Sequence, residues 1–288
     1  MAIGSYCEVD VAAALKASGV RRGDLIYMPS AFFALGRMEG ISIHDIPERI
    51  VGIVKEFIGP EGTLTVPASF DDYARFAHEY DTKRSPVDAG QGAISQYVAN
   101  LPDAFRSYCP LNAVAGIGPL ANEVCHGWTG AAYGVGSAWD RLYENDAKFV
   151  CLGVAPNQIL NFVYYVQQRF GVPHLYNKLF TTPVYEDGVR INLTITSLVR
   201  YLDTRFTVIE NTTKFENYLT DIGLIRQVTL GRGNVYVIES ARKIFSEAIK
   251  KLSEDVFYFL EHPPKFVEGE VPMDGPTGKM QTDKERYQ

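Results

Sequence analysis

The chain has no run of basic residues and no excess of positive charge. Its 288 residues include 28 Lys and Arg against 34 Asp and Glu, which gives a net charge of −6 at pH 7. Proteins that bind nucleic acid present clustered Lys and Arg to the phosphate backbone. We therefore expect no nucleic-acid partner. A small anionic substrate could still bind at individual basic residues.

Long hydrophobic runs are also missing. No stretch approaches the roughly 20 apolar residues that a membrane-spanning helix needs. The N-terminal sequence MAIGSYCEVDVAAALKASGV does not begin with a basic segment that leads into an apolar one, as a secretion signal would. We therefore expect no membrane partner and a cytoplasmic location.

Cysteine is scarce, and its spacing is not that of a metal site. The four cysteines are Cys7, Cys109, Cys125 and Cys151. They form no CxxC pair and no His-rich cluster, so we expect no bound metal. Hydrophobic residues make up 46% of the chain and charged residues 22%, which is typical of a globular protein with a large core.

The N-terminal third has the pattern of an α/β fold. A helix is predicted over Val9–Ser18, followed by a strand at Leu25–Ser30. A second helix follows, with Asp45 as its N-cap and Gly59 as its stop signal. A second strand then lies in Glu61–Phe70. Strand, helix and strand at this spacing predict a βαβ unit.

The rest of the chain continues the alternation of strands and helices. The stretch 71–92 reads as a long surface loop. A buried strand at Lys148–Val154 runs through a turn into an amphipathic helix, a common place for an α/β active site. Further elements are predicted as a helix at 94–101, β structure over 181–206, a helix at 214–222, a hairpin around 231–233 and a helix at 240–260. We expect one domain over 1–262 and a polar, flexible tail over 263–288.

Six blocks of sequence, in order and in register, resemble the aminoglycoside 3-N-acetyltransferase family. They cover most of the chain, from about Asp10 to His262. The blocks are GDLIYMPSAFFALG (23–36), EGTLTVPASF (61–70), YDTKRSP (80–86), FRSYCPLNAVAGIGP (105–119), GVGSAWDRLYENDAKFVCLGV (134–154) and GVPHLYNKLF (171–180). The resemblance implies a central mixed β-sheet flanked by helices. It also implies transfer of an acetyl group from acetyl-CoA to an amine, often on an amino sugar.

The family's catalytic residues look replaced. Its His-x-x-Glu motif, a general base with an orienting carboxylate, falls on Tyr164 and Gln167. Histidines elsewhere in the family's pattern fall on Cys109, Asn112 and Pro29. A tyrosine with a pKa of about 10 is a poor base at neutral pH. The resemblance therefore identifies the lineage and leaves the reaction open.

Four residues are candidates for chemistry. Tyr164 and Gln167 hold the motif positions, although the same helix could use its aromatics only to fill the core. His174 is the nearest histidine in sequence and is a candidate substitute base. Cys109 could accept an acyl group if Arg106 lowered its pKa, and the alternative is a buried, inert thiol.

Two further groups of residues are candidates for binding, one for coenzyme A, implied by the resemblance, and one for the amine substrate. Ser30 resembles a coenzyme A contact of the family, with a helix N-cap as the alternative. An acidic segment after the second predicted strand could hold a cationic amine, or could be a solvated loop. The cofactor-binding candidates are Ser30, Phe70, Gly90 and Gly92, and the substrate-binding candidates are Asp71, Asp72 and Tyr73.

The leading hypothesis is an acyl-CoA-dependent N-acyltransferase. It would act on an amine such as a biosynthetic amino sugar, with acetyl-CoA as co-substrate and catalysis by positioning. One alternative is a non-catalytic relative that serves as a ligand-binding or assembly subunit. Another is altered acyl-transfer chemistry through Cys109 or Tyr164. The sequence leaves open whether the chain forms a homo-oligomer.

Overall fold

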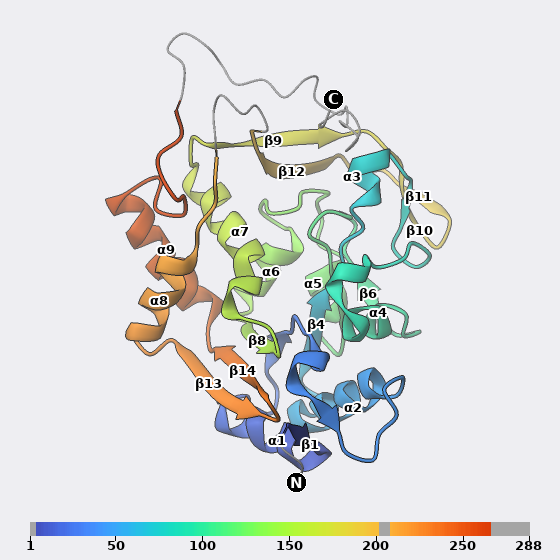
Figure 1. The fold of residues 1–288 in the computed structure, drawn as a ribbon. Coiled ribbons are helices and arrows are strands. Elements are labelled where there is room, and N and C mark those ends of the chain that lie inside the picture. Colours follow the sequence, from blue (N-terminus) through green and yellow to red (C-terminus); the bar gives the residue numbers. More distant parts are fainter. Residues whose placement is uncertain (1–3, 202–207, 266–288) are drawn as a thin grey trace, which may run out of the picture.

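The computed structural model describes residues 4–201 and 208–265, and its centre is a seven-stranded mixed sheet (Figure 1). In spatial order the strands are β13 (Ile225–Leu230), β14 (Gly233–Ile238), β8 (Lys148–Leu152), β2 (Leu25–Tyr27), β4 (Thr63–Pro67), β7 (Val114–Ile117) and β6 (Phe105–Arg106). Strand β2 is parallel to both of its neighbours, β8 and β4, and the other pairs are antiparallel. The predicted mixed α/β fold is confirmed.

The predicted βαβ unit is present as β2, α2 (Ile46–Ile58) and β4. Helix α2 forms because apolar residues recur on one face, where Ile50 and Val54 are buried. Asp45 precedes the helix without a side-chain cap bond, and Gly59 ends it with a φ of 74°, a conformation that favours glycine.

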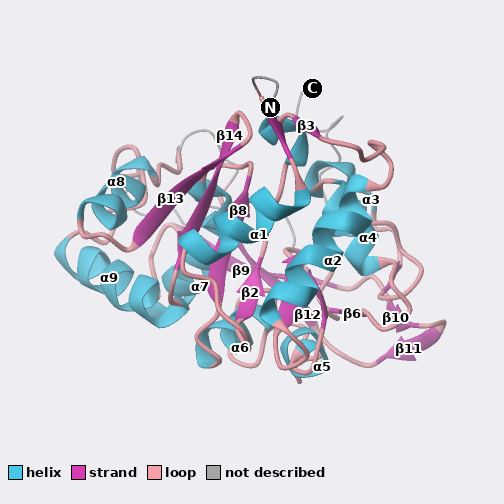
Figure 2. Cartoon of the chain, turned by 90° about the horizontal axis from the view of Figure 1, so that it is seen from below, coloured by secondary structure: helices cyan, strands magenta, loops and turns pink. Residues whose placement is uncertain are grey.

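Alternate residues of the central strands point to opposite faces of the sheet, and each face has its own helical layer. Ile26 and Val150 join a core cluster with α1 (Glu8–Ala17), α2 and α4 (Ala93–Ala99). Their neighbours Tyr27 and Phe149 join a second cluster with α6 (Ala138–Glu144), α7 (Leu160–Phe170) and α9 (Ala241–Glu254). Figure 2 shows α1 and α2 lying across the strands on the first face.

Shorter helices, turns and strands lie around this core. The remaining helices are α3 (Asp72–Phe76), α5 (Ala121–Cys125) and α8 (Thr213–Asp221), with 3-10 turns at η1 (Phe32–Leu35), η2 (Ala89–Gln91) and η3 (Pro156–Ile159). In one small sheet β1 (Ser5–Tyr6) pairs with β3 (Arg37–Met38). In another, β10 (Val184–Glu186) is the central strand and pairs with β5 (Tyr80–Asp81) on one side and β11 (Val189–Ile191) on the other.

A separate antiparallel ribbon lies over one end of the molecule. It consists of β9 (Leu175–Phe180) and β12 (Ile195–Arg200). In Figure 1 the ribbon lies at the end of the molecule opposite the N-terminus, beyond the C-terminal part of α7. This ribbon forms one wall of the candidate site described below.

The structure differs from the predictions at three places. The segment 71–92 contains α3, β5 and η2 and is not a plain loop. Helix α9 ends at Glu254, where Asp255 turns to extended backbone. Strand β9 was not predicted at all. Residues 266–288 of the predicted tail lie outside the described residues.

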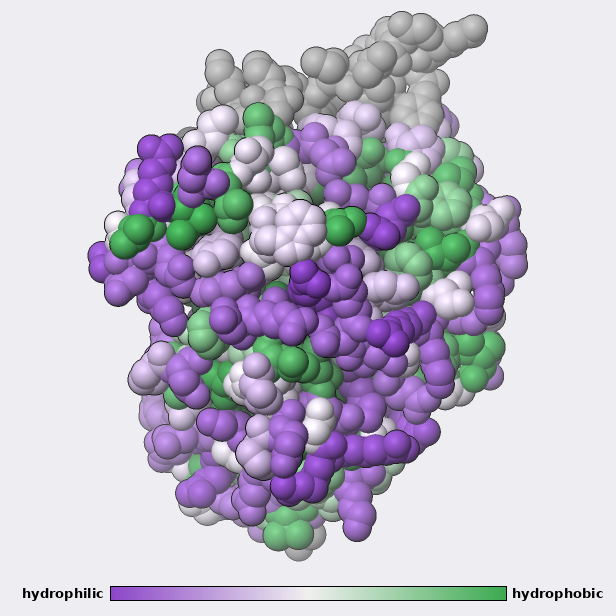
Figure 3. Space-filling model, turned by 180° about the vertical axis from the view of Figure 1, so that it is seen from behind, coloured by the Kyte–Doolittle hydropathy of each residue, from purple (hydrophilic) through white to green (hydrophobic). Residues whose placement is uncertain are grey.

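The surface is mostly polar on the face shown in Figure 3, where hydrophobic groups are scattered among hydrophilic ones. Within residues 4–201 and 208–265, no helix combines the length and the apolar composition that crossing a bilayer requires.

Candidate active site

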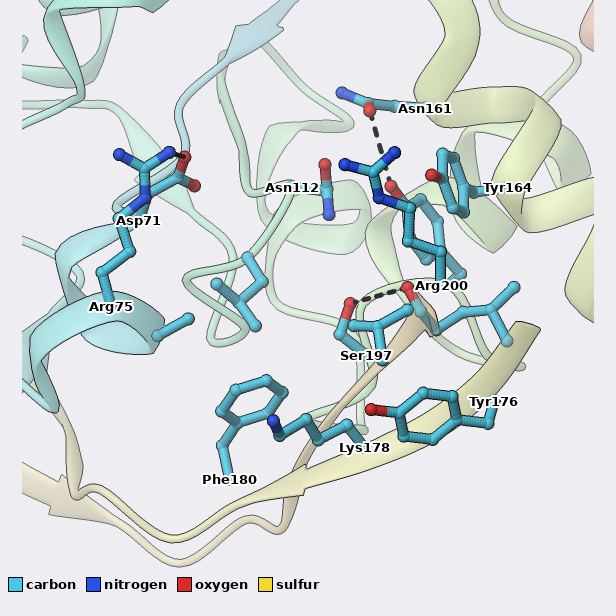
Figure 4. Close-up of a pocket in the computed structure, with 15 residues that line it drawn as sticks. Asp71, Arg75, Asn112, Asn161, Tyr164, Tyr176, Lys178, Phe180, Ser197 and Arg200 are labelled. Atoms are coloured by element: carbon cyan, nitrogen blue, oxygen red, sulfur yellow. Dashed lines mark hydrogen bonds and ion pairs between the residues drawn. The ribbon is translucent and has the colours of Figure 1, made fainter. Parts of the chain in front are cut away.

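A cavity of about 390 Å³ lies between α7, the β9–β12 ribbon and the start of α3 (Figure 4). Helix α7 supplies one wall and the ribbon another, and a loop after β6 contributes Asn112. The polar and charged side chains of the lining are Asp71, Arg75, Asn112, Tyr133, Asn161, Tyr164, Tyr176, Lys178, Ser197 and Arg200.

Tyr164 is fixed in this cavity from two sides. It follows Asn161 by three residues on α7, so both side chains project from one face of the helix. Its ring stacks on Tyr133, with ring centroids 5.5 Å apart and planes 13° from parallel. The Tyr164 hydroxyl donates a hydrogen bond to the Glu210 carboxylate. Tyr133 in turn donates to Asn161 Oδ1 at 3.5 Å.

Burial determines the protonation of the Tyr164–Glu210 pair. Burial raises the pKa of Tyr164, and the neighbouring Glu210 charge raises it further. Tyr164 is therefore a neutral hydrogen-bond donor and cannot act as a phenolate base. Burial also raises the pKa of Glu210, while the Tyr164 hydrogen bond and the Arg200 charge act in the opposite direction. The Tyr164 hydroxyl therefore links the Glu210 carboxylate to the cavity.

Two basic residues of the ribbon also line the cavity. Lys178 on β9 is 9% exposed, and the ribbon register places it opposite Ser197 of β12. Arg200 ends β12 and is exposed. Asp71 forms an ion pair with Arg75 at 3.7 Å, so its carboxylate already has a cationic partner.

Gln167 and His174 contact each other and are not among the residues that line the cavity. His174 Nε2 lies 2.9 Å from Gln167 Oε1, and both side chains are buried. Burial lowers the pKa of His174 to about 4, which leaves the ring neutral at pH 7. The ring packs against Phe257, so this pair is part of the packing around α7.

Cys109 is buried in a tight environment. Its Sγ lies 3.5 Å from the carbonyl oxygen of Leu111, and burial raises its pKa to about 12. Arg106 does not activate it, because that guanidinium donates to the backbone carbonyls of Ala68, Ser85 and Pro86. A thiol with this pKa forms almost no thiolate at neutral pH.

The cofactor-binding candidates gather beyond the carboxyl ends of β2 and β4. A Cβ on Gly92, whose φ is 86°, would lie 2.8 Å from the carbonyl oxygen of Ser30. Ser30 Oγ is buried, and no hydrogen-bond partner for it occurs in the described part of the chain. Phe70 is buried and stacks on Tyr80, whereas Gly90 has open space around it.

The three substrate-binding candidates lie in different environments, and one of them, Asp71, is in the cavity lining. Asp72 instead faces His78, at 3.7 Å from Nδ1. Tyr73 is fully buried, and its hydroxyl donates to the carbonyl oxygen of Thr182 at 2.8 Å.

Sequence reasoning missed several residues of the cavity. Asn161 stands three residues before Tyr164 and was within reach of a helical-face argument. Lys178, Arg200 and Glu210 gave no such signal, because long-range pairing brings them to the site. Within the described ranges, no group of three or more His, Cys, Asp or Glu side chains is arranged to hold a metal ion.

The chain is similar in sequence to aminoglycoside 3-N-acetyltransferases. The family model described as aminoglycoside 3-N-acetyltransferase matches residues 30–253. Aminoglycoside N(3)-acetyltransferase III of Serratia marcescens is 27% identical over 197 residues, which is 63% of this chain and 71% of that enzyme. An enzyme of the same name from a Salmonella species is 27% identical over 177 residues, which is 56% of this chain and 60% of that enzyme.

Solved structures of similar fold cover more of the chain. AAC-IIIb, described as binary with CoASH, superposes with a TM-score of 0.71 at 19% identity over 87% of this chain and 97% of that one. AAC-VIa bound to sisomicin gives a TM-score of 0.72 at 21% identity, over 87% and 98%. These likenesses confirm the predicted fold, and the named relatives support an N-acetyltransferase enzyme.

Proposed function

The chain belongs to the aminoglycoside 3-N-acetyltransferase family, and on this premise we propose that it transfers the acetyl group of acetyl-CoA to the amine of an amino sugar other than an antibiotic. The observation that carries the proposal is the cavity beside α7. It is lined by Tyr164 and Asn112, two positions at which the resemblance expects histidine. The family's catalytic position therefore opens onto a space that a sugar can occupy.

The reaction needs a proton acceptor and a donor for the developing oxyanion. The amine nitrogen attacks the thioester carbonyl carbon and forms a C–N bond. The C–S bond then breaks, and sulfur leaves with the electron pair as a thiolate. The nitrogen gives up a proton, and the thiolate takes one up. Hydrogen-bond donors aimed at the carbonyl oxygen stabilise the charge that develops there.

We assign the proton-acceptor role to Glu210, acting through Tyr164. Tyr164 would take the amine proton while its own hydroxyl proton passes to the carboxylate. The Tyr164–Glu210 hydrogen bond supplies the path. Burial raises the pKa of Glu210, which brings this carboxyl closer to the pKa of a useful general base at neutral pH.

Acetyl-CoA as co-substrate fits the residues at the carboxyl ends of β2 and β4. The buried Ser30 hydroxyl has no partner in the described chain, whereas buried polar groups normally have a partner in protein or water, so a coenzyme atom bound at this edge would satisfy it. Gly92 lets the backbone approach Ser30 closely. Phe70 directly precedes Asp71 of the cavity, so this edge and the cavity adjoin.

Calorimetry with acetyl-CoA, followed by an assay for free thiol with a panel of amines, tests the proposal. We expect binding at or below the millimolar range, and thiol release that depends on the amine. Absence of acetyl-CoA binding at millimolar ligand would overturn the transferase. Binding without thiol release from any amine would favour a non-catalytic relative.

A further inference from the structure

The side chain of Asn112 lines the cavity without a hydrogen-bond partner. Other polar groups of the lining are committed to a neighbour. Tyr164 donates to Glu210, and Asp71 pairs with Arg75. Within residues 4–201 and 208–265, no group is hydrogen-bonded to the Asn112 carboxamide, and Figure 4 shows it without an interaction to the other lining residues. Its two amide N–H donors are therefore open to a substrate in the cavity.

The turn that carries Asn112 is hydrogen-bonded to the segment that follows β4. The Ala68 N–H donates to the carbonyl oxygen of Ala113 at 2.8 Å, and the Phe70 N–H donates to that of Pro110 at 2.9 Å. These two bonds lie on either side of Asn112 in the sequence. Asn112 therefore stands where the candidate coenzyme edge, which includes Phe70, meets the cavity.

The backbone of Asn112 is held in a left-handed conformation, with a φ of 54°. Its carbonyl oxygen accepts a hydrogen bond from Nε1 of the buried Trp139 at 2.9 Å. Asparagine adopts this conformation more readily than most residues, so a turn-forming role explains the backbone. Glycine would serve the turn equally well. The turn alone therefore does not account for a carboxamide that faces the cavity without a partner.

We propose that the Asn112 carboxamide is the oxyanion donor of acetyl transfer. As the C–N bond forms, the carbonyl π electrons move to oxygen, and the Asn112 N–H donates to that oxygen. When the C–S bond breaks, the electrons return and the thiolate leaves. The inference rests on the proposed function and assigns a residue to the donor that the reaction needs. A donor fixed in place before the reaction stabilises the developing charge without reorganisation.

The location of Asn112 suits this role. The thioester has to extend from the coenzyme edge to the amine beside Tyr164, and the Asn112 turn joins these two places through its bonds to Ala68 and Phe70. Arg200 is the competing donor, because its guanidinium also lines the cavity. Arg200 is exposed at the end of β12, whereas the backbone of Asn112 is fixed from both sides.

Asn112→Gly is the decisive variant, because glycine keeps the left-handed backbone without steric cost and removes the amide. Loss of one oxyanion donor lowers kcat by about 10²–10³. We expect this loss in thiol release from acetyl-CoA with glucosamine, at unchanged calorimetric affinity for acetyl-CoA and an unchanged urea midpoint. Asn112→Asp, whose carboxylate has no N–H, should lose at least as much. Ala77→Gly is the matched control, because Ala77 has the same φ of 54° outside the lining, and it should keep the kcat of the parent.

A second readout needs no acceptor. Infrared difference spectra of bound acetyl-CoA, isotope-labelled at the acetyl carbonyl, should place the carbonyl stretch at lower wavenumber in the parent than in Asn112→Gly, because a donated hydrogen bond weakens the C=O bond. If no amine is turned over, this comparison decides, and equal frequencies would overturn the inference.

Turnover of Asn112→Gly within about threefold of the parent would also overturn it. So would an equal loss in Ala77→Gly, or a hundredfold loss confined to Arg200→Gln, which would assign the oxyanion to the guanidinium. Thiol release by the parent keeps the proposed function intact in each of these cases. Absence of acetyl-CoA binding would overturn both.

Discussion

Replacing Glu210 by Gln separates its chemical role from its structural one. The amide is isosteric with the carboxylate and can still accept the hydrogen bond that Tyr164 donates. It cannot take up a proton at neutral pH. Removal of a general base lowers turnover by about 10²–10⁴. We therefore expect kcat of Glu210→Gln to fall roughly a hundredfold or more.

The stability of the same variant should move in the other direction. Burial raises the folded-state pKa of Glu210, so the folded protein binds this proton more tightly than the unfolded chain does. Stability from this group is fully present below the ordinary pKa of 4.5 and is lost as the pH rises through the raised value. At pH 7 the ionised carboxylate therefore disfavours folding. Glu210→Gln should be at least as stable as the parent at pH 7, and the difference should shrink in acid.

Tyr164→Phe is the matched comparison. It keeps the ring that stacks on Tyr133 and removes the donor to Glu210. A buried acceptor left without its partner costs about 1–3 kcal/mol, so this variant should lose both turnover and stability. Thiol-release kinetics from pH 5 to 9 and urea unfolding at pH 7 read out both effects. The reasoning is refuted if Glu210→Gln keeps its turnover within about threefold, or if its loss of activity is matched by a loss of stability.

Three further outcomes are expected from residues around the site. Burial holds the pKa of His174 at about 4 against an ordinary 6.5, so about 3 kcal/mol of folding stability should be lost as the pH falls from 6.5 to 4. In urea unfolding, His174→Gln should lose less stability than the parent over this pH range. An equal loss would contradict the assignment. Cys109→Ala should keep its turnover, because burial raises the thiol pKa to about 12, and a loss of acyl transfer at unchanged stability would restore the covalent mechanism. Gly92→Ala should unfold about 1–3 kcal/mol more easily, since its Cβ would lie 2.8 Å from Ser30. Gly90→Ala, which meets nothing within 4 Å, is its control, and equal stability of the two variants would show that the close approach is not strained.

The sequence predicts the central architecture well, because local patterns carry it. Strand β2, helix α2 and strand β4 follow from apolar periodicity and from the stop at Gly59. The strand-to-helix turn before α7 is equally local, and Tyr164 of that helix lines the cavity. Asn112, which holds another histidine position of the family's pattern, also lines the cavity.

The basic residues of the ribbon and the carboxylate partner of Tyr164 could not be predicted in this way. Lys178 and Arg200 come to line one cavity through the pairing of β9 with β12, and strand register between distant segments is not encoded in either segment alone. Glu210 reaches Tyr164 across 46 positions of sequence. Gln167 has the helical spacing of the motif, but its side chain contacts His174 and does not line the cavity. The spacing along a helix does not determine which neighbour a side chain contacts.

Acetyl transfer itself is tested most directly by one measurement, the initial rate of free thiol release from acetyl-CoA with glucosamine, with the acetylated product identified by mass. We expect release that saturates with the amine, adds one acetyl group to it and falls roughly a hundredfold or more in Glu210→Gln. Acetyl-CoA that neither binds nor reacts at millimolar concentration would contradict the proposed function.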